Sequence, residues 1–268
     1  MGIKSRRLCF FIKIIVCTCI RYYSKSVKII YEIDLGGHKM DGSVTNIHNF
    51  KFDYDQAFDR NIGFVTEWEQ QILRSKKIAI AGMGGVGGIH LTTLTRMGIG
   101  HFHIADFDRF ELANFNRQAG ATITTLGQSK VEVMRKAALD INPEAEIKVF
   151  AEGVQSSNID KFLEGVDLYV DSLDFFALEI RQLVFARCYE LGIPAITAGP
   201  IGLGTAYLIF MPGQMSFDEY FCLSQVSKEK QPVNFLLGLL PTPLHLRYLV
   251  DPSHLDLAGK RGPSSASA

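Results

Sequence analysis

Residues 77–88 read KIAIAGMGGVGG, a compact apolar run followed at once by a cluster of glycines. The run has the length of a short buried strand, and the glycines supply a tight turn. Residues 89–97 then place apolar side chains at helical spacing, and the GIG at 98–100 ends that helix. The sequence therefore predicts a strand, a glycine turn and a helix in succession.

A second strand is predicted directly after this helix. Residues 101–106 read HFHIAD, in which histidines alternate with apolar residues before the acidic Asp106. Two strands joined by a helix within about 30 residues form a βαβ unit, whose strands run parallel.

The alternation of strands and helices continues along the chain. Helices are predicted at 129–141, 158–163 and 176–191, and strands at 146–151, 166–171, 194–198 and 204–210. A capping box at 66–69 predicts a short helix ahead of the first strand. The fold class is therefore α/β, a doubly wound Rossmann-like sheet that is mostly parallel. We expect an irregular C-terminal segment, because five prolines punctuate residues 232–263.

The glycine turn predicts a nucleotide site. Gly82, Gly84 and Gly87 leave backbone N–H groups bare at a helix N-terminus, where they can hold phosphate. Asp106 follows about 20 residues later, where a carboxylate can accept hydrogen bonds from ribose hydroxyls. This pattern does not distinguish an NAD site from an ATP site. Alternatively, the glycines serve only the close packing of the helix on the strand.

Charged residues further along favour ATP. A nucleotidyl transferase must neutralise the charge of a reacting phosphate and of a pyrophosphate leaving group, a task that suits Arg117 and Lys130. Asp174 comes just past the predicted strand 166–171, where a carboxylate can hold Mg²⁺ against phosphate oxygens. Asp174 is therefore the candidate metal ligand.

Over about residues 55–215 the sequence resembles the ThiF/MoeB/HesA family, the bacterial relatives of ubiquitin-activating enzymes. The resemblance rests on G-x-G-G-x-G, D-x-D, N-x-N-R-Q, G-x-x-K and D-x-x-D, which begin at residues 82, 106, 114, 127 and 171. It implies that ATP and Mg²⁺ adenylate a C-terminal carboxylate, usually the Gly-Gly end of a ubiquitin-like sulfur carrier protein, within a homodimer.

The resemblance also implies roles for individual residues. The candidate nucleotide-binding residues are Gly82, Gly84, Gly85, Gly87, Asp106, Asp108, Asn114, Asn116, Arg117 and Lys130. The candidate catalytic residues are Arg60, Arg117, Lys130 and Asp174. Arg60 lies in a segment that resembles the family's early arginine segment, from which an Arg reaches into the partner subunit's site. Asp108 has two interpretations, a second ribose or metal contact and a residue that starts a loop.

Two departures from the family pattern stand out. Phe175 occupies a position where many members carry Asn, which puts contacts to adenine or metal in doubt. The paired C-x-x-C motif of many members is absent, so a closed zinc site is not expected.

The predicted function is that of an ATP-dependent adenylyltransferase that activates a carboxylate, with a carrier protein, a peptide or a small acid as acceptor. Two alternatives remain open. One is a catalytically silent, nucleotide-binding dimer partner, although Arg60, Arg117, Lys130 and Asp174 are all present. The other is an NAD-dependent oxidoreductase, for which no clear catalytic acid or base is found.

Composition excludes several other classes of protein. The 268 residues are 47% hydrophobic, enough for a sizeable core, and 28 Lys and Arg balance 28 Asp and Glu. A nucleic-acid partner is therefore not expected, because such binding depends on clustered positive charge.

The first 39 residues differ from the rest, with eight Lys and Arg against two acidic residues. The apolar run 8–20 is interrupted by Lys13 and is too short for a membrane span, which takes about 20 residues. Three interpretations remain: a peripheral membrane anchor, a cytosolic extension, or residues upstream of a start at Met40. We favour the third.

Cysteine usage indicates a reducing cytoplasm. Three of the five cysteines lie in the first 39 residues, and Cys188 and Cys222 are far apart in the body. Cys188 is expected to be a core thiol, and Cys222 to be packed rather than to form a thioester or persulfide with an acceptor. His101 and His103 are expected to mark one face of a strand rather than to bind a ligand.

Four segments result: the extension 1–39, a helical lead-in 40–76, a ThiF-type ATP-binding domain 77–215 and the irregular segment 216–268. The sequence leaves open whether the chain is truncated and whether a truncated chain would be active.

Overall fold

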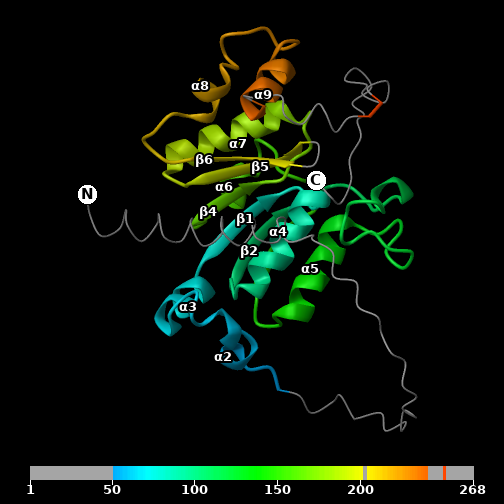
Figure 1. Cartoon of the computed structure of the whole chain (residues 1–268), viewed down its shortest axis with the longest axis vertical. Helices are drawn as coiled ribbons and strands as arrows, with labels where there is room; N and C mark the ends of the chain where they lie inside the picture. Colours follow the sequence, from blue (N-terminus) through cyan, green and yellow to red (C-terminus); the bar gives the residue numbers. More distant parts are fainter. Residues whose placement is uncertain (1–50, 202–203, 241–249, 252–268) are drawn as a thin grey trace. The chain divides into compact units, whose positions relative to one another are not determined.

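The computed structural model describes residues 51–201, 204–240 and 250–251 (Figure 1). The chain divides into two compact units, residues 1–59 and residues 60–268. The described part of the first unit contains α2 (Tyr54–Ala57), whose N-terminus is capped by Asp53 through a 2.9 Å hydrogen bond from the Gln56 N–H. The predicted extension 1–39 lies outside the described residues.

The second unit contains one sheet with the strand order β3-β2-β1-β4-β5-β6 (Figure 1). The strands are β1 (Lys77–Ala81), β2 (His101–Ala105), β3 (Glu146–Phe150), β4 (Leu168–Asp171), β5 (Ala195–Ile201) and β6 (Gly204–Phe210). Strands β1 to β5 run parallel, and β6 pairs antiparallel with β5. This confirms the predicted doubly wound, mostly parallel sheet. The order of strands reverses between β1 and β4, the position at which open α/β sheets bind ligands beyond their carboxyl ends.

Helices precede, connect and follow the strands. They are α3 (Glu67–Arg74), α4 (Gly85–Arg96), α5 (Lys130–Ile141), α6 (Ile159–Phe162), α7 (Leu178–Leu191), α8 (Phe217–Phe221) and α9 (Gln231–Leu239), with 3₁₀ turns η2 (Asp59–Asn61) and η3 (Leu112–Asn114). The predicted capping box is confirmed at the start of α3. In the described part of the chain, no helix combines the length and apolar content needed to cross a bilayer.

The two faces of the sheet carry different side chains. Successive residues of a strand point to opposite faces, so Ile78 and Ile80 share one face, while Ala79 and Ala81 share the other. On the alanine face, small strand residues leave room for a cluster of buried rings that includes Phe162, from α6. Burial of each large apolar side chain stabilises the fold by roughly 1.5–3 kcal/mol, so this cluster holds α6 and α7 against the sheet.

Helix α4 begins earlier than predicted, at Gly85 instead of residue 89. The apolar spacing that predicts the helix begins only at Ile89, because the glycines before it carry no side chain to mark a face. Four glycine-turn residues thus already form the first turn of the helix.

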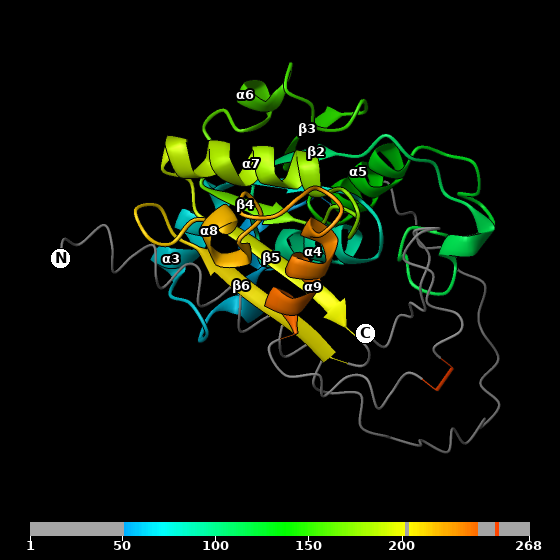
Figure 2. The same ribbon diagram turned by 90° about the horizontal axis from the view of Figure 1, so that it is seen from above.

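The described residues 216–240 of the C-terminal segment are more regular than predicted. Two helices, α8 and α9, follow β6, and Figure 2 displays them beside α7. Ser216 and Glu219 form a capping box at the start of α8. Pro232 lies in the first turn of α9. N–H groups in the first turn have no acceptor within the helix, so the missing N–H of proline costs no hydrogen bond there. The proline that argued against regular structure therefore marks the start of a helix.

Candidate functional site

The glycine turn connects β1 to α4 next to the end of β4. Gly82 has a φ of +94°, a conformation that favours glycine. A Cβ at Gly82 would overlap the backbone oxygen of Ser172, and one at Gly87 would overlap that of Gly82. Gly84 provides the N-cap of α4 without a side-chain hydrogen bond, so the first N–H groups of the helix are not capped by a side chain. The turn is therefore closely packed and presents backbone donors at a helix N-terminus.

Asp106, directly after β2, ties this turn to the next strand. One carboxylate oxygen accepts a 2.6 Å hydrogen bond from the Met83 N–H, and the other accepts a 2.8 Å bond from the Asp108 N–H. A carboxylate has about four lone-pair positions, so Asp106 keeps acceptor capacity for a ligand hydroxyl. Its structural role was not predicted.

Lys130 is the first residue of α5 and is held by Asp108. Its ammonium lies 2.9 Å from the Asp108 carboxylate, and its N–H donates to the Asp108 carbonyl at 3.0 Å. Asp108 lies in the loop after β2, which agrees with the second of its two interpretations, and its carboxylate also pairs with Lys130.

Arg117 lies beside the glycine turn. Its Cγ would be 3.7 Å from a Cβ at Gly85. The guanidinium Nη1 donates to the Ala113 carbonyl at 2.7 Å and to the Asn116 side chain at 3.0 Å. Its Nε and Nη2 groups make no hydrogen bond to the described residues, so a guanidinium with five donors retains some for a phosphate.

Asn114 is buried, and its side-chain oxygen accepts the Glu111 N–H at 3.0 Å at the start of η3. The Asn114 side chain therefore stabilises the turn η3, which directly precedes the segment containing Arg117. Asn116 is exposed and contacts Arg117 as described above.

Two oxygen atoms beside the turn lack a partner within the described part of the chain, Oε1 of Gln118 and Oγ of Ser172. The Gln118 side chain, 8% exposed as a residue, would lie 3.5 Å from a Cβ at Gly84. The Ser172 Cβ would be 3.1 Å from a Cβ at Gly87. Buried oxygens normally have protein or water partners, so these two leave acceptor positions beside the glycine turn for water or a polar ligand. Both residues lie within motifs of the sequence, but no role was predicted for them.

The two aspartates of the D-x-x-D motif have different environments. Asp171 is buried and forms a 2.7 Å ion pair with Arg181. Asp174 is exposed in the loop after β4, where its carboxylate accepts the Phe176 N–H at 3.0 Å. No cluster of three or more metal-ligating side chains occurs among the described residues. Mg²⁺ is commonly held by one or two carboxylates together with phosphates, so Asp174 fits that pattern and Asp171 does not.

Arg60 lies far from the glycine turn of its own chain. The neighbouring Asn61 side chain donates to the Arg96 carbonyl at 3.4 Å, at the C-terminal end of α4. The glycine turn is at the opposite end of this 12-residue helix, a separation of about 18 Å. The structure therefore does not bring Arg60 to the other candidate residues of the same chain.

His90, which the sequence did not single out, is buried in α4. Desolvation lowers its pKa to about 4, against a smaller opposing effect of the Asp171 charge. His90 has no clear signal in the sequence, because residues 89–97 also contain three threonines and an arginine.

The other cysteines and histidines have structural contacts. Cys188 is a core thiol, as predicted, and burial raises its pKa. Cys222 is half-buried at the end of α8, with its thiol 3.5 Å from the Glu219 carbonyl. His103 is buried, with Nδ1 2.7 Å from the Phe162 carbonyl.

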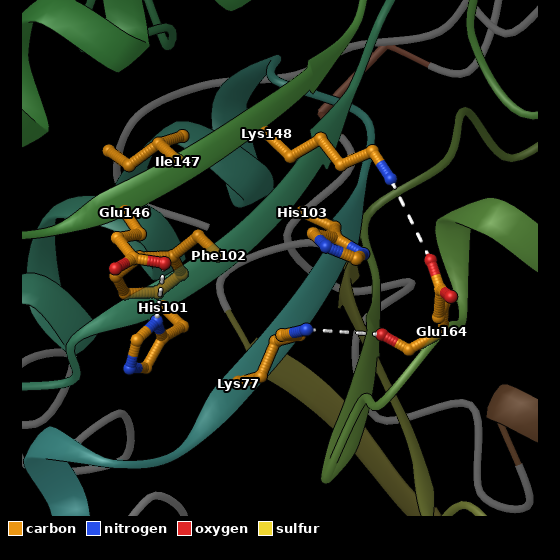
Figure 3. A pocket seen from close by; sticks show the side chains of 8 residues that line it. All are labelled: Lys77, His101, Phe102, His103, Glu146, Ile147, Lys148 and Glu164. Carbon is orange, nitrogen blue, oxygen red and sulfur yellow. Dashed lines mark hydrogen bonds and ion pairs between the residues drawn. The ribbon is translucent and has the colours of Figure 1, made fainter.

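A cavity of about 350 Å³ lies away from these residues (Figure 3). Its lining includes Lys77, His101 and Glu146, which begin β1, β2 and β3, whereas the glycine turn follows the opposite end of β1. The His101 Nδ1 atom lies 3.3 Å from the Glu146 carboxylate, and the Lys77 ammonium donates to the Glu164 carbonyl at 3.3 Å. This cavity is therefore separate from the candidate nucleotide site.

Several known proteins are similar to this chain. A tRNA threonylcarbamoyladenosine dehydratase from Bacillus subtilis is 30% identical over 142 residues, which are 53% of this chain and 55% of the relative. Ubiquitin-like modifier-activating enzyme 5 from Aedes aegypti is 36% identical over 152 residues, 52% of this chain and 37% of the relative. Among solved structures, TcdA (CsdL) is 29% identical with a TM-score of 0.53, and the match covers 55% of this chain and 58% of that one. The chain thus spans about half or less of the curated relatives it matches.

The ThiF family model matches residues 58–238, a range that begins just before Arg60 and ends within α9. This range includes every candidate site residue named above and most of the chain. The chain belongs to the ThiF family.

Proposed function

We propose that the protein is an ATP-dependent adenylyltransferase that activates a carboxylate, namely the C-terminus of a ubiquitin-like sulfur carrier protein. One observation carries the proposal: the ends of three neighbouring strands bear the uncapped glycine turn, the Asp108 and Lys130 pair, and the exposed Asp174. Membership of the ThiF family supports the same activity.

The nucleotide binds beyond the carboxyl ends of β1, β2 and β4. Backbone N–H groups at the start of α4 hold phosphate oxygens, and Asp106 accepts a ribose hydroxyl. The oxygens of Gln118 and Ser172, which lack protein partners in the described part, accept hydrogen bonds from the ligand or its water.

Asp174 holds Mg²⁺ in this proposal, since it is an exposed carboxylate beside the phosphate-binding turn. When bound, Mg²⁺ neutralises phosphate charge. Asp171 takes no part, because its carboxylate is committed to Arg181.

The reaction requires no protein nucleophile. A carboxylate oxygen of the acceptor attacks the α-phosphorus, the bond to the bridging oxygen breaks, and the products are an acyl adenylate and pyrophosphate. Arg117 and Lys130 are the cations that stabilise the negative charge on the phosphates. The buried position of Lys130 strengthens this effect, because it excludes water around the ammonium.

The acceptor is a protein tail in this proposal. The relatives' names mention both a modified tRNA nucleoside and ubiquitin-like modifiers. This chain has equal numbers of acidic and basic residues, which disfavours a polyanion as large as tRNA.

The active form is a homodimer, because Arg60 is about one helix length from the site of its own chain. In a symmetric pair, Arg60 completes the partner's site. Apolar side chains beside Arg60 and beside Asp106 support such an interface: Phe64 and Phe107 are both 76% exposed.

Two other functions compete with this one. A silent dimer partner would bind ATP without reacting, and an NAD-dependent oxidoreductase would bind a nicotinamide cofactor. The cationic Arg117 and Lys130 favour a triphosphate over a nicotinamide cofactor. The presence of Arg117, Lys130 and Asp174 together disfavours the silent partner.

The test is ATP–pyrophosphate exchange by the full chain, with a panel of Gly-Gly-ended carriers, peptides, tRNA and small acids. We expect exchange that depends on a carrier protein and falls at least about a hundredfold in Arg117→Ala and Asp174→Ala. Matched controls are Arg135→Ala and Asp140→Ala, exposed residues of α5 whose surface ion pairs should leave exchange unchanged.

Other outcomes point elsewhere. ATP binding without exchange, for every acceptor, would favour the silent partner. Binding of NAD in preference to ATP would overturn the proposal.

A further inference from the structure

One buried arginine holds the loop that carries Asp174. Arg181 of α7 is 3% exposed and donates to the carbonyls of Leu173 at 2.6 Å, Asp174 at 3.0 Å and Phe175 at 3.3 Å. A planar guanidinium with five donors can span three consecutive carbonyls in this way, which a single ammonium cannot. The backbone on either side of Asp174 is therefore held by hydrogen bonds from the buried Arg181 side chain.

The guanidinium is itself held in place. Its Nε donates to Asp171 at 2.7 Å, and the same carboxylate oxygen accepts the Thr197 hydroxyl at 2.8 Å. The other Asp171 oxygen accepts the Leu173 N–H at 3.2 Å. The end of β4, Thr197 within β5 and the loop are thus joined through one buried ion pair.

Helix α9 covers this arrangement. The ring of Phe235, 2% exposed, has its centroid 4.8 Å from the Arg181 guanidinium and 5.3 Å from the Phe175 ring. Asn234 ties α9 to α8 through a 3.3 Å bond to the Phe221 carbonyl. Phe175, which departs from the family pattern, is accommodated by packing against α9.

We propose that Arg181 and Phe235 are positioning residues for the metal-binding carboxylate of Asp174, and that α9 thereby sets how strongly Mg²⁺ enhances ATP binding. The role of Asp174 in this statement rests on the proposed function. The contacts of Arg181 with residues 173–175 do not depend on it.

The main variant is Arg181→Lys, which keeps a positive charge beside Asp171 but loses the fork that spans three carbonyls. Its matched control is Arg187→Lys, on the same helix, because Arg187 also forms ion pairs, with Asp160 and Glu190, but its side chain is 35% exposed and contacts no carbonyl of the described loop. A second pair is Phe235→Leu, with Leu237→Ala as its control, since Leu237 is 62% exposed on the same helix.

The first measurement is hydrogen exchange of the full chain without nucleotide. In the loop, the N–H groups of Leu173, Phe176 and Ala177 donate to Asp171 or Asp174. We expect these amides to exchange about tenfold faster in Arg181→Lys and not in Arg187→Lys, because the bonds that fix the loop are lost. Unchanged exchange in both Arg181→Lys and Phe235→Leu would overturn the proposal.

The second measurement is the Kd for ATP with Mg²⁺ and with chelator. We expect the enhancement by Mg²⁺ to fall about tenfold in Arg181→Lys and by a smaller factor in Phe235→Leu, with the metal-free Kd unchanged. If Mg²⁺ enhances ATP binding in both variants as strongly as in the unmodified protein, Arg181 and Phe235 do not set the effect of Mg²⁺. If the unmodified protein binds no ATP, the proposed function fails, while hydrogen exchange still decides whether Arg181 holds the loop. If Arg181→Lys does not fold, Phe235→Leu decides both questions.

Discussion

The Lys130 ammonium lies 2.9 Å from the Asp108 carboxylate, and the two side chains differ in exposure, at 7% and 53%. Lys130 begins α5, where the helix dipole disfavours a cation. Asp108 offsets this effect and orients the ammonium. The pair therefore explains how a lysine can occupy a buried position beside the candidate nucleotide site.

Asp108→Asn removes the charge that holds Lys130. We expect the free energy of unfolding to fall by about 1 kcal/mol, a small value because Asp108 is half exposed. We also expect the Kd for ATP to rise several-fold, since the ammonium is no longer oriented. Denaturant unfolding and titration with ATP measure the two effects. Asp140→Asn, which breaks a surface pair on the same helix, is the control, and identical behaviour of the two variants would refute this role of Asp108.

Gly87→Ala tests the close packing of the glycine turn. The new Cβ would overlap the Gly82 carbonyl, a backbone atom that cannot move without opening the turn. We expect destabilisation by more than about 2 kcal/mol and loss of ATP binding. Gly199→Ala is a control, since its Cβ would lie 3.6 Å from Leu239 in ordinary contact and should cost less than about 0.5 kcal/mol. A stable Gly87→Ala protein that binds ATP would show that the turn is looser than described.

His90 makes stability depend on pH. Its pKa is lowered from 6.5 to about 4 in the folded chain, so between these values the unfolded chain binds a proton that the folded chain does not. The free energy of unfolding therefore falls as pH drops through this window, by about 3 kcal/mol in total, and the contribution is fully present above pH 6.5.

His90→Gln removes this titration. Unfolding curves at pH 8 and pH 5 should reveal a smaller loss of stability on acidification than in the unmodified protein. An equal loss in both proteins would mean that His90 is not the group responsible.

Mixing two inactive variants tests whether Arg60 acts in the partner's site. Arg60→Ala lacks the finger, and Lys130→Ala lacks a cation in its own site. A mixed dimer pairs an intact site with an intact finger, so random mixing should restore about a quarter of the exchange activity of the unmodified protein. Full activity of Arg60→Ala alone, or no recovery on mixing, would contradict action in trans.

Elements with strong local patterns were predicted well. The bounds of β1 match residues 77–81, because an apolar run that ends in glycines marks both ends of a strand. The helices of residues 216–240 were missed, because Pro232 indicates a break unless it occupies the first turn of a helix. The position of a proline within a helix can be predicted only if the first residue of the helix is known. The N-terminus of α9 has no capping side chain that would mark this residue in the sequence.

The candidate site was predictable only in part. The glycine turn and Asp106 follow from motif and spacing, and the structure brings them together through the Met83 N–H. The role of Arg181 has no local signal, because its partners are carbonyls six to eight residues earlier. The pairing of Asp108 with Lys130 likewise joins residues 22 positions apart and appears only in the folded chain.

In the proposed reaction, an acceptor carboxylate attacks the α-phosphorus of ATP. The most direct measurement uses the carrier that supports exchange, with heavy oxygen in its C-terminal carboxylate, and follows the label by mass spectrometry after the acyl adenylate is cleaved with hydroxylamine. We predict that one labelled oxygen appears in the released AMP. Labelled oxygen in inorganic phosphate, or AMP without label, would show that the carboxylate does not attack the α-phosphorus.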